Sequence, residues 1–207
     1  MTHTHFAISS ALRAQAPHTI LPTQSRLDQL LPGCSELLSQ ACREVADLVP
    51  YRVRQALNQA VTPRLAPSII IASLLKLPRA EHSYTRHVLH ADPKGRYTVV
   101  ALIWEAGHFS PVHAHFTWCA YRVLSGALRE THYAWDQAAG HAYPLSHLER
   151  IAGHSACSHA GLDFIHRLGH AGQADAEPAI SLHVYGIDSE RIGTHVNRAL
   201  ASIRRLD

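Results

Sequence analysis

Gly107-His108-Phe109-Ser110-Pro111-Val112-His113-Ala114-His115 is the stretch that decides how the middle of this chain folds. It follows the run Tyr97–Trp104, which is rich in β-branched and aromatic residues and predicts a strand. In an extended strand, residues i and i+2 point to the same face, about 7 Å apart. His113 and His115 can therefore bind one metal ion from one wall of a barrel, because imidazole is the commonest protein ligand for metals near neutral pH.

The composition is that of an ordinary globular protein. The chain has 207 residues, of which 46% are hydrophobic and 17% charged, which predicts one domain with a sizeable core. We find no uncharged apolar run of about 18 residues and expect no membrane span. The first residues, Met1–Phe6, lack a basic region followed by an apolar one, so we expect no signal peptide.

Charge and cysteine content exclude several classes of protein. The net charge is +3 and the basic residues are scattered, whereas nucleic-acid-binding proteins usually carry a basic stripe. The four cysteines form no Cys-x-x-Cys pair and are too few for a disulfide scaffold. These features predict a cytoplasmic protein that binds no nucleic acid.

The first third of the chain has a helical pattern from Gln24 to about Thr62. Ser35 and Glu36, just after Pro32-Gly33, predict a helix start. Apolar residues then recur at spacings of three and four, at Leu37, Leu38, Ala41, Val45, Leu48 and Val49. The apolar run Ser68–Leu75 is ambiguous between a strand and a buried helix.

From Tyr84 onward, short apolar runs alternate with turn signals, which is typical of a β-sandwich or barrel. The expected strands are Tyr84–Leu89, Tyr97–Glu105, Val112–His115, Cys119–Ser125, Ala127–Ala134, His147–Gly153, Leu162–Leu168 and Ala179–Tyr185. We therefore predict a single, mainly β domain over residues 1–207. Its parts are a poorly ordered start (1–20), a helical layer (21–78), an antiparallel barrel with the metal site (79–186) and a C-terminal extension (187–207).

A firm metal site needs a third ligand from a distant strand. Two histidines on apolar runs are candidates, His166 in Phe164–Leu168 and His183 in Ser181–Tyr185. A lone histidine on such a strand is more often a hydrogen-bonded core residue. The pair His113 and His115 is more specific, because leaving a buried polar group unpaired costs about 1–3 kcal/mol.

Four motifs together resemble a known family. The pattern Gly107-x5-His113-x-His115-x3-Cys119-x6-Gly126 resembles the first cupin motif, with Cys119 in place of the usual glutamate. More narrowly, it resembles the cysteine dioxygenase family, the thiol dioxygenase branch of the cupins. The other three motifs, in the family's order over roughly residues 80–186, are Tyr84-Thr85-Arg86, His166-Arg167-Leu168 and Ser181-Leu182-His183-Val184-Tyr185.

The resemblance implies a cupin fold, a small β-barrel with N-terminal helices packed on it, and a role for each matching residue. His113, His115 and His166 would bind Fe(II), and Arg86 would bind the substrate carboxylate. His183 would hydrogen-bond to Tyr185, with Ser181 behind it. The segment between His115 and Cys119 is one residue shorter than in the mammalian form, which resembles the bacterial branch. We also expect Tyr84 and Trp118 to line the substrate pocket.

These roles make chemical sense. Three neutral imidazoles leave Fe(II) with its full charge, which favours deprotonation of an incoming thiol. Arg86 offers a planar fork suited to a carboxylate. In relatives that prefer 3-mercaptopropionate this arginine is typically absent, so its presence favours L-cysteine. Cys119 would form a thioether with Tyr185, as in mammalian members, or serve as a small buried hydrophobic residue.

The sequence therefore predicts a dioxygenase that uses a small thiol and O2, as a monomer or small homo-oligomer. Other mercapto-carboxylates, 3-mercaptopropionate or mercaptosuccinate, remain open as substrates. A non-redox enzyme such as a zinc hydrolase or isomerase is a second class, because a three-histidine site also suits zinc. A cupin that binds a ligand without turnover is the third.

Overall fold

The computed structural model describes residues 18–19, 26–61 and 67–203. Most of the segment 1–20, expected to be poorly ordered, and the expected helix start at Gln24 lie outside these residues. The helical elements are α1 (Arg26–Leu30), α2 (Cys34–Ala41), the short 3-10 helix η1 (Ala46–Leu48), α3 (Val49–Ala60) and α4 (Pro67–Leu75). The ambiguous apolar run Ser68–Leu75 is thus a helix.

The helices follow from apolar spacing and from their first residues. In α3, Pro50 occupies the first turn, where its missing N–H costs nothing, and Val53 and Leu57 are fully buried one turn apart. The α2 helix begins at Cys34, one residue before the expected start. Val45 and Leu48 belong to the predicted helical spacing, but α2 ends at Ala41, and they lie in the connection to α3, where they are 67% and 48% exposed.

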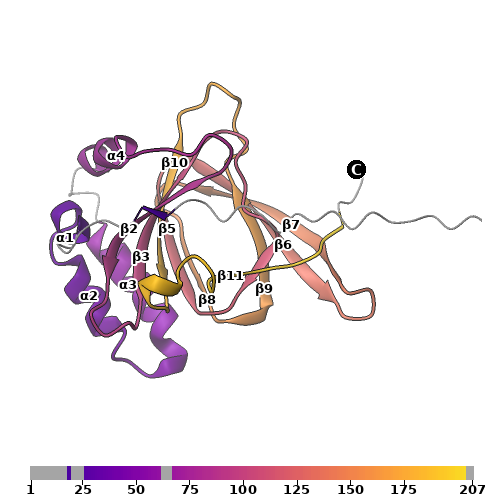
Figure 1. The fold of residues 1–207 in the computed structure, drawn as a ribbon, viewed down its shortest axis with the longest axis horizontal. Coiled ribbons are helices and arrows are strands. Elements are labelled where there is room, and N and C mark those ends of the chain that lie inside the picture. The colour runs from indigo at the N-terminus through magenta and orange to yellow at the C-terminus, as the bar shows by residue number, and fades with distance from the viewer. Residues whose placement is uncertain (1–17, 20–25, 62–66, 204–207) are drawn as a thin grey trace, which may run out of the picture.

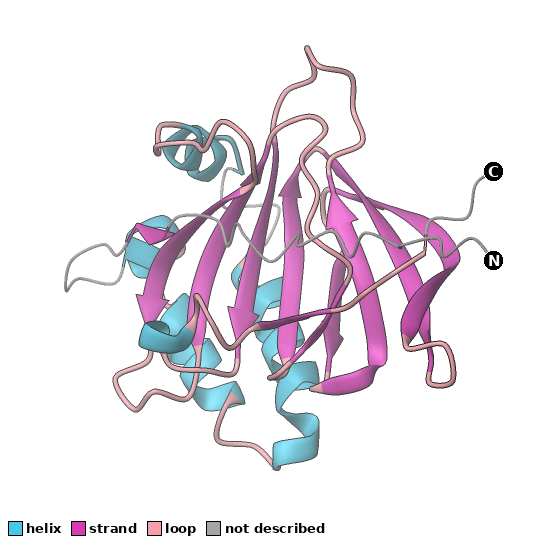
Figure 2. Ribbon diagram, turned by 45° about the vertical axis from the view of Figure 1, so that its right-hand side comes forward, coloured by secondary structure: helices cyan, strands magenta, loops and turns pink. Residues whose placement is uncertain are grey.

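The strands form two sheets that face each other. One sheet has the order β1-β2-β3-β10-β5-β8, and the other has the order β11-β4-β9-β6-β7. The strands are β1 (His18–Thr19), β2 (Thr85–Ala91), β3 (Thr98–Trp104), β4 (His113–His115), β5 (Cys119–Ser125), β6 (Ala127–Asp136), β7 (His141–Ile151), β8 (Ser155–Ser158), β9 (Gly161–Gly169), β10 (Ala179–Tyr185) and β11 (Asn197–Ala199). All pairings are antiparallel except that of β1 with β2. The predicted fold, a cupin-type antiparallel barrel with N-terminal helices, is confirmed (Figures 1 and 2).

The first sheet is buried on both faces. Along β10 every residue is buried, and the residues alternate between the two sides. Ile180, Leu182 and Val184 pack into the core under the helices, whereas Tyr185 belongs to the core inside the barrel. Figure 1 shows the helices α1 to α3 beside this sheet and the second sheet beyond it. The barrel interior is therefore formed by the inner faces of two sheets.

The main departures from the predicted strands lie at the edges of both sheets, at β7 and β11 of the second sheet and at β8 of the first. β7 begins at His141 rather than His147, and it includes Pro144, which an edge strand tolerates because one side of its backbone needs no partner. β8 was not expected. Nor was β11, which lies in the segment we expected to be an extension, and which pairs with the histidine strand β4.

The turn between β5 and β6 requires a glycine, as the predicted Ser125-Gly126 turn indicated. Gly126 has φ of 72°, and a Cβ atom there would lie 2.9 Å from the Cβ of Ala179 on β10. All four cysteines are unpaired. Among the helices of the described residues, none is both long and apolar enough to cross a membrane.

Candidate metal centre

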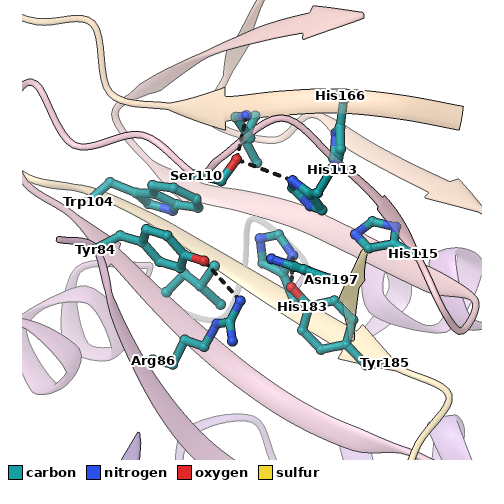
Figure 3. Close-up of a pocket in the computed structure, with 12 residues that line it drawn as sticks. Tyr84, Arg86, Trp104, Ser110, His113, His115, His166, His183, Tyr185 and Asn197 are labelled. Carbon is teal, nitrogen blue, oxygen red and sulfur yellow. Dashed lines mark hydrogen bonds between the residues drawn. The ribbon is translucent and has the colours of Figure 1, made fainter. Parts of the chain in front are cut away.

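Three histidines meet inside the barrel. His113 and His115 lie on β4 and point to the same face, and His166 lies opposite His113 in the neighbouring strand β9. One ligand nitrogen from each of the three lies within 4.8 Å of the others. All three side chains are buried (Figure 3). The structure therefore selects His166, and not His183, as the third member of the cluster.

Each imidazole uses its Nδ1 atom to contact the protein. Nδ1 of His113 donates to the carbonyl oxygen of Pro111 at 2.9 Å, and Nδ1 of His115 lies 3.4 Å from Oγ of Ser158. Nδ1 of His166 donates to the Glu130 carboxylate at 2.7 Å. Nε2 is left to bind a metal, and Nε2 of His166 is buried with no partner among the described residues. These contacts fix ring orientation in the way that typifies metal-binding histidines.

Glu130 is a fully buried carboxylate behind this cluster. Besides His166, it accepts hydrogen bonds from Nε of Arg150 at 2.7 Å and from the Tyr121 hydroxyl at 3.2 Å. Burial alone would raise the pKa of Glu130, but the hydrogen bonds and charges of His166 and Arg150 hold that pKa below its usual range. Glu130 therefore remains an anion and can accept the Nδ1 proton of His166.

Burial keeps two of the clustered rings neutral. It lowers the pKa of His113 and of His115 well below the ordinary histidine value, and the neighbouring imidazoles lower both further. A metal binds the neutral ring. The donor set, three clustered imidazoles that contact the protein through Nδ1, therefore fits a metal ion of the kind that histidine binds.

The predicted carboxylate-binding residue lies across the pocket, on β2 of the first sheet. Arg86 is buried and donates from one terminal nitrogen to the Tyr84 hydroxyl at 2.8 Å, and its Nε has no partner among the described residues. The Tyr84 ring stacks on Trp104 with a centroid distance of 4.4 Å. Both rings line the pocket with Arg86 and hold its guanidinium in place (Figure 3).

The predicted Ser181, His183 and Tyr185 form a hydrogen-bonded chain along β10. Oγ of Ser181 lies 2.9 Å from Nε2 of His183, and Nδ1 of His183 lies 3.2 Å from the Tyr185 hydroxyl. Burial, with the charges of His166 and Arg86, lowers the pKa of His183 to about 3, so that its ring is neutral. His183 and Tyr185 line the pocket, and Ser181 lies behind them.

Trp104 fixes the direction of this chain. Its indole N–H can only donate, and it donates to Oγ of Ser181 at 2.9 Å. Ser181 is fully buried, so its own hydrogen needs an acceptor, and Nε2 of His183 is the one within reach. His183 then carries its proton on Nδ1 and donates to the Tyr185 oxygen, so the Tyr185 hydroxyl hydrogen is free to donate into the pocket.

Comparison with known proteins identifies the family. The sequence profile of the family "Cysteine dioxygenase type I" matches residues 78–195, which is more than half of the chain. This chain belongs to the cysteine dioxygenase family. The match includes all the pocket-forming motifs that the sequence indicated, from Tyr84 to Tyr185.

Curated relatives of the cysteine dioxygenase family align over the same region. The chain is 31% identical over 111 residues to "Cysteine dioxygenase type 1" of Homo sapiens and 30% identical over 110 residues to that of Bos taurus. Each alignment covers 51% of this chain and 52% of the relative, so the chain spans about half the length of the curated relatives it matches. A solved Klebsiella pneumoniae protein, described as uncharacterized with a double-stranded β-helix domain, is 22% identical with a TM-score of 0.42. That alignment covers 60% of this chain and 84% of the Klebsiella chain.

Cys119, in the slot of the usual cupin glutamate, stands beside Tyr185 in this cysteine dioxygenase family member. The two are direct partners in the antiparallel pairing of β5 with β10, and both belong to the core inside the barrel. Cβ atoms of directly opposed residues lie about 4.5–5.5 Å apart. Burial raises the pKa of the Cys119 thiol, which is therefore protonated at neutral pH. Cys119 does not itself line the pocket.

Trp118 does not line the pocket of this cysteine dioxygenase family member, contrary to the expectation from the sequence. Because Cys119 faces the barrel interior, its neighbour Trp118 faces the other way. Trp118 packs against the core under the helices, and its indole covers Gly186, where a Cβ atom would lie only 2.2 Å away. The aromatic wall of the cysteine dioxygenase pocket is instead formed by Trp104 and Tyr84.

Several residues of this pocket were not predicted from the sequence. They are Leu102, Trp104, Ser110, Leu168 and Asn197, with Glu130 behind His166. Trp104 was visible in the sequence near the end of the predicted strand Tyr97–Glu105, but no pattern singled it out. Asn197 lies on β11, which carries no strand signal of its own.

Proposed function

We propose that this protein is a cytoplasmic, Fe(II)-dependent thiol dioxygenase that oxidises L-cysteine with O2 to cysteine sulfinate. The observation that carries the proposal is the content of one pocket: three buried, clustered imidazoles, with Nε2 of His166 unpaired among the described residues, line it together with a buried arginine whose Nε is also unpaired. Both atoms of O2 become bonded to the substrate sulfur, and the thiol hydrogen stays in the sulfinic acid. The reaction therefore balances without another reductant.

His113, His115 and His166 would hold the iron, which when bound would supply the oxidation of the thiol sulfur by O2. Arg86 would bind the substrate carboxylate through its unpaired Nε and so set how far the sulfur reaches toward the histidines. The apolar side chains of Leu102 and Leu168 line the same pocket and exclude water from the reacting atoms.

Tyr185 would act as a hydrogen-bond donor to the reacting substrate. Burial raises the pKa of Tyr185 well above its ordinary value, so its hydroxyl keeps its hydrogen. His183 occupies the other side of the Tyr185 oxygen and orients the hydroxyl toward the pocket. Tyr185 thus offers a proton at a fixed position without titrating near neutral pH.

The bacterial branch and the monomer or small homo-oligomer remain predictions from the sequence. Iron rather than another metal, and L-cysteine rather than 3-mercaptopropionate or mercaptosuccinate, belong to the proposal. The buried cation favours substrates with a carboxylate, since a buried guanidinium without an anion is costly. Cysteamine, which lacks a carboxylate, is therefore expected to be a poor substrate.

The test compares these four thiols with protein loaded with Fe(II) or with Zn(II). Oxygen uptake is followed with an electrode, and products are identified by mass spectrometry. We expect one mole of O2 consumed per mole of sulfinate, with L-cysteine and Fe(II) only. Equal turnover with Zn(II), or no oxygen uptake with any of the thiols, would overturn the proposal.

A further inference from the structure

We propose that Asn197 recognises the α-amino group of the substrate and makes the enzyme selective for an amino-acid thiol. This inference rests on the proposed function and adds a residue that selects among small thiols with a carboxylate. It is carried by the position of Asn197 in the pocket and by the hydrogen-bonding capacity that the pocket leaves unused.

Asn197 lies between the metal ligands and the pocket space. It is the first residue of β11, and its Cα partner across the strand pair is His115 on β4. Side chains of directly opposed residues point to the same face, which is consistent with both residues lining the pocket. Asn197, His183, Arg86 and His115 line the same pocket, and in the view of Figure 3 Asn197 is drawn between Arg86 and His115.

The unpaired atoms of the pocket match an amino acid. Within the described residues, three of its side chains have buried polar atoms without a partner: Nε of Arg86, Nε2 of His166 and Oδ1 of Asn197. The first is a donor suited to a carboxylate, and the second belongs to the metal cluster. Oδ1 of Asn197 is the acceptor that remains, and it calls for an N–H donor on the ligand.

L-cysteine fills all three positions at once. Its carboxylate would meet Arg86 on the first sheet, its sulfur would approach the histidines of the second sheet, and its α-amino group would donate to Oδ1 of Asn197. 3-Mercaptopropionate has no group to donate there, so binding it leaves the Asn197 carbonyl buried and unpaired. Mercaptosuccinate carries a second carboxylate in place of the amino group. That carboxylate needs a hydrogen-bond donor, but Oδ1 of Asn197 is an acceptor.

The experiment compares Asn197→Leu, which keeps the size but removes the acceptor, with Asn197→Asp, which keeps an oxygen acceptor. Arg198→Gln, at the exposed next position of β11, is the matched control. Dissociation constants for L-cysteine and 3-mercaptopropionate are measured by calorimetry without oxygen on the iron-loaded proteins. The kcat/KM values and the iron contents are measured in parallel.

We expect Asn197→Leu to weaken L-cysteine binding and kcat/KM by about 10- to 100-fold and to change 3-mercaptopropionate by less than about twofold, at unchanged iron content. Asn197→Asp should retain most of the affinity for L-cysteine. Equal losses for both thiols, or no loss for L-cysteine, would overturn the role of Asn197 while leaving the dioxygenase intact. If the unaltered protein oxidises no thiol, the proposed function fails, whereas a selective loss of L-cysteine affinity still supports the role of Asn197.

Discussion

Glu130 accepts a 2.7 Å hydrogen bond from Nδ1 of His166, across the paired strands β6 and β9. Both side chains are buried, and the carboxylate is also bonded to Arg150. In the resemblance to the first cupin motif, Cys119 stands in place of the usual glutamate. Glu130 places a negative charge one hydrogen bond behind His166, so under the proposed function it would orient the ring without occupying a coordination position.

We predict that Glu130→Gln weakens metal binding by about 10- to 100-fold, because His166 loses a charged acceptor. The dissociation constant for Zn(II), measured by competition with a chromophoric chelator, checks this without any turnover. Glu149→Gln, an exposed carboxylate on β7, should leave the affinity unchanged. Glu130→Gln also removes the charged partner of Arg150, so the melting temperature of Glu130→Gln should fall. Unaltered Zn(II) affinity in Glu130→Gln would contradict the role of the carboxylate.

Arg86→Ala should raise the apparent KM for L-cysteine by about 10- to 100-fold, because the carboxylate loses a charged donor in a buried site. Iron content, measured by mass spectrometry of the metal, should stay the same, because Arg86 donates its hydrogen bond to Tyr84 and not to one of the three histidines. Arg129→Ala, an exposed arginine of β6, is the control. Kinetics like those of the unaltered enzyme would remove Arg86 from the substrate site.

Trp104→Phe keeps the aromatic bulk but removes the N–H that donates to Ser181. Ser181 is then free to accept from His183, so we expect the proton of His183 to move from Nδ1 toward Nε2. Nitrogen NMR shifts of the His183 ring report this tautomer directly, and kcat should fall by about 2- to 10-fold with little change in KM. Trp135→Phe, on β6, tests whether losing any indole has this effect. An unchanged tautomer would show that the direction of the chain is not set by Trp104.

Cys119 and Tyr185 are placed for an oxidative thioether. Joining the sulfur to a ring carbon removes two hydrogen atoms, with O2 as the oxidant. We expect peptide mapping after many turnovers to show this loss on a cross-linked pair of peptides, and to show none in Cys119→Ser. A free Cys119 thiol after prolonged turnover would establish the alternative role, that of a small buried hydrophobic residue.

Stability of the metal-free protein should fall as the pH drops below about 6.5. Burial lowers the pKa of His113, His115 and His183 in the folded state, so the unfolded chain binds more protons than the folded one below the ordinary histidine pKa. Each contributes stability that is present above that pKa and decreases as the pH falls, by up to about 1.4 kcal/mol per pH unit. Urea denaturation between pH 5 and 8 measures the slope. His183→Asn should flatten it, and His82→Asn, at an exposed position, should not.

The sequence was sufficient for the barrel and for most of the pocket because local patterns encode them. His113 and His115 are two apart on a strand, and His183 and Tyr185 share a face for the same reason. The spacing could not choose between His166 and His183 as third ligand, since that choice depends on which strand pairs with β4. The expectation at Trp118 failed for a different reason: bulk next to a predicted site residue suggested a pocket contact, but Trp118 lies just before β5 and packs against the core under the helices.

The site residues that the sequence analysis missed are brought to the pocket by pairing between strands that are distant in sequence. Glu130 meets His166 through the register of β6 and β9, and their separation of 36 positions leaves no local signal. Asn197 reaches the pocket because β11 returns along β4. Val45 and Leu48 continue the apolar spacing of α2, but the helix ends at Ala41 and they fall in the connection that follows.

The alternation of β10 makes selection for activity and selection for folding act on the same seven residues. Ser181, His183 and Tyr185 form the hydrogen-bonded chain that the proposed chemistry uses, while Ile180, Leu182 and Val184 between them pack against the helical layer. Inserting or deleting a single residue in this strand would exchange the two sets and destroy both functions together. A change in side-chain volume on the helix-facing side of β10 would shift the backbone that also positions the pocket residues of this strand. Inactive variants of this enzyme are therefore expected to map to the helix-facing side of β10 as often as to the pocket.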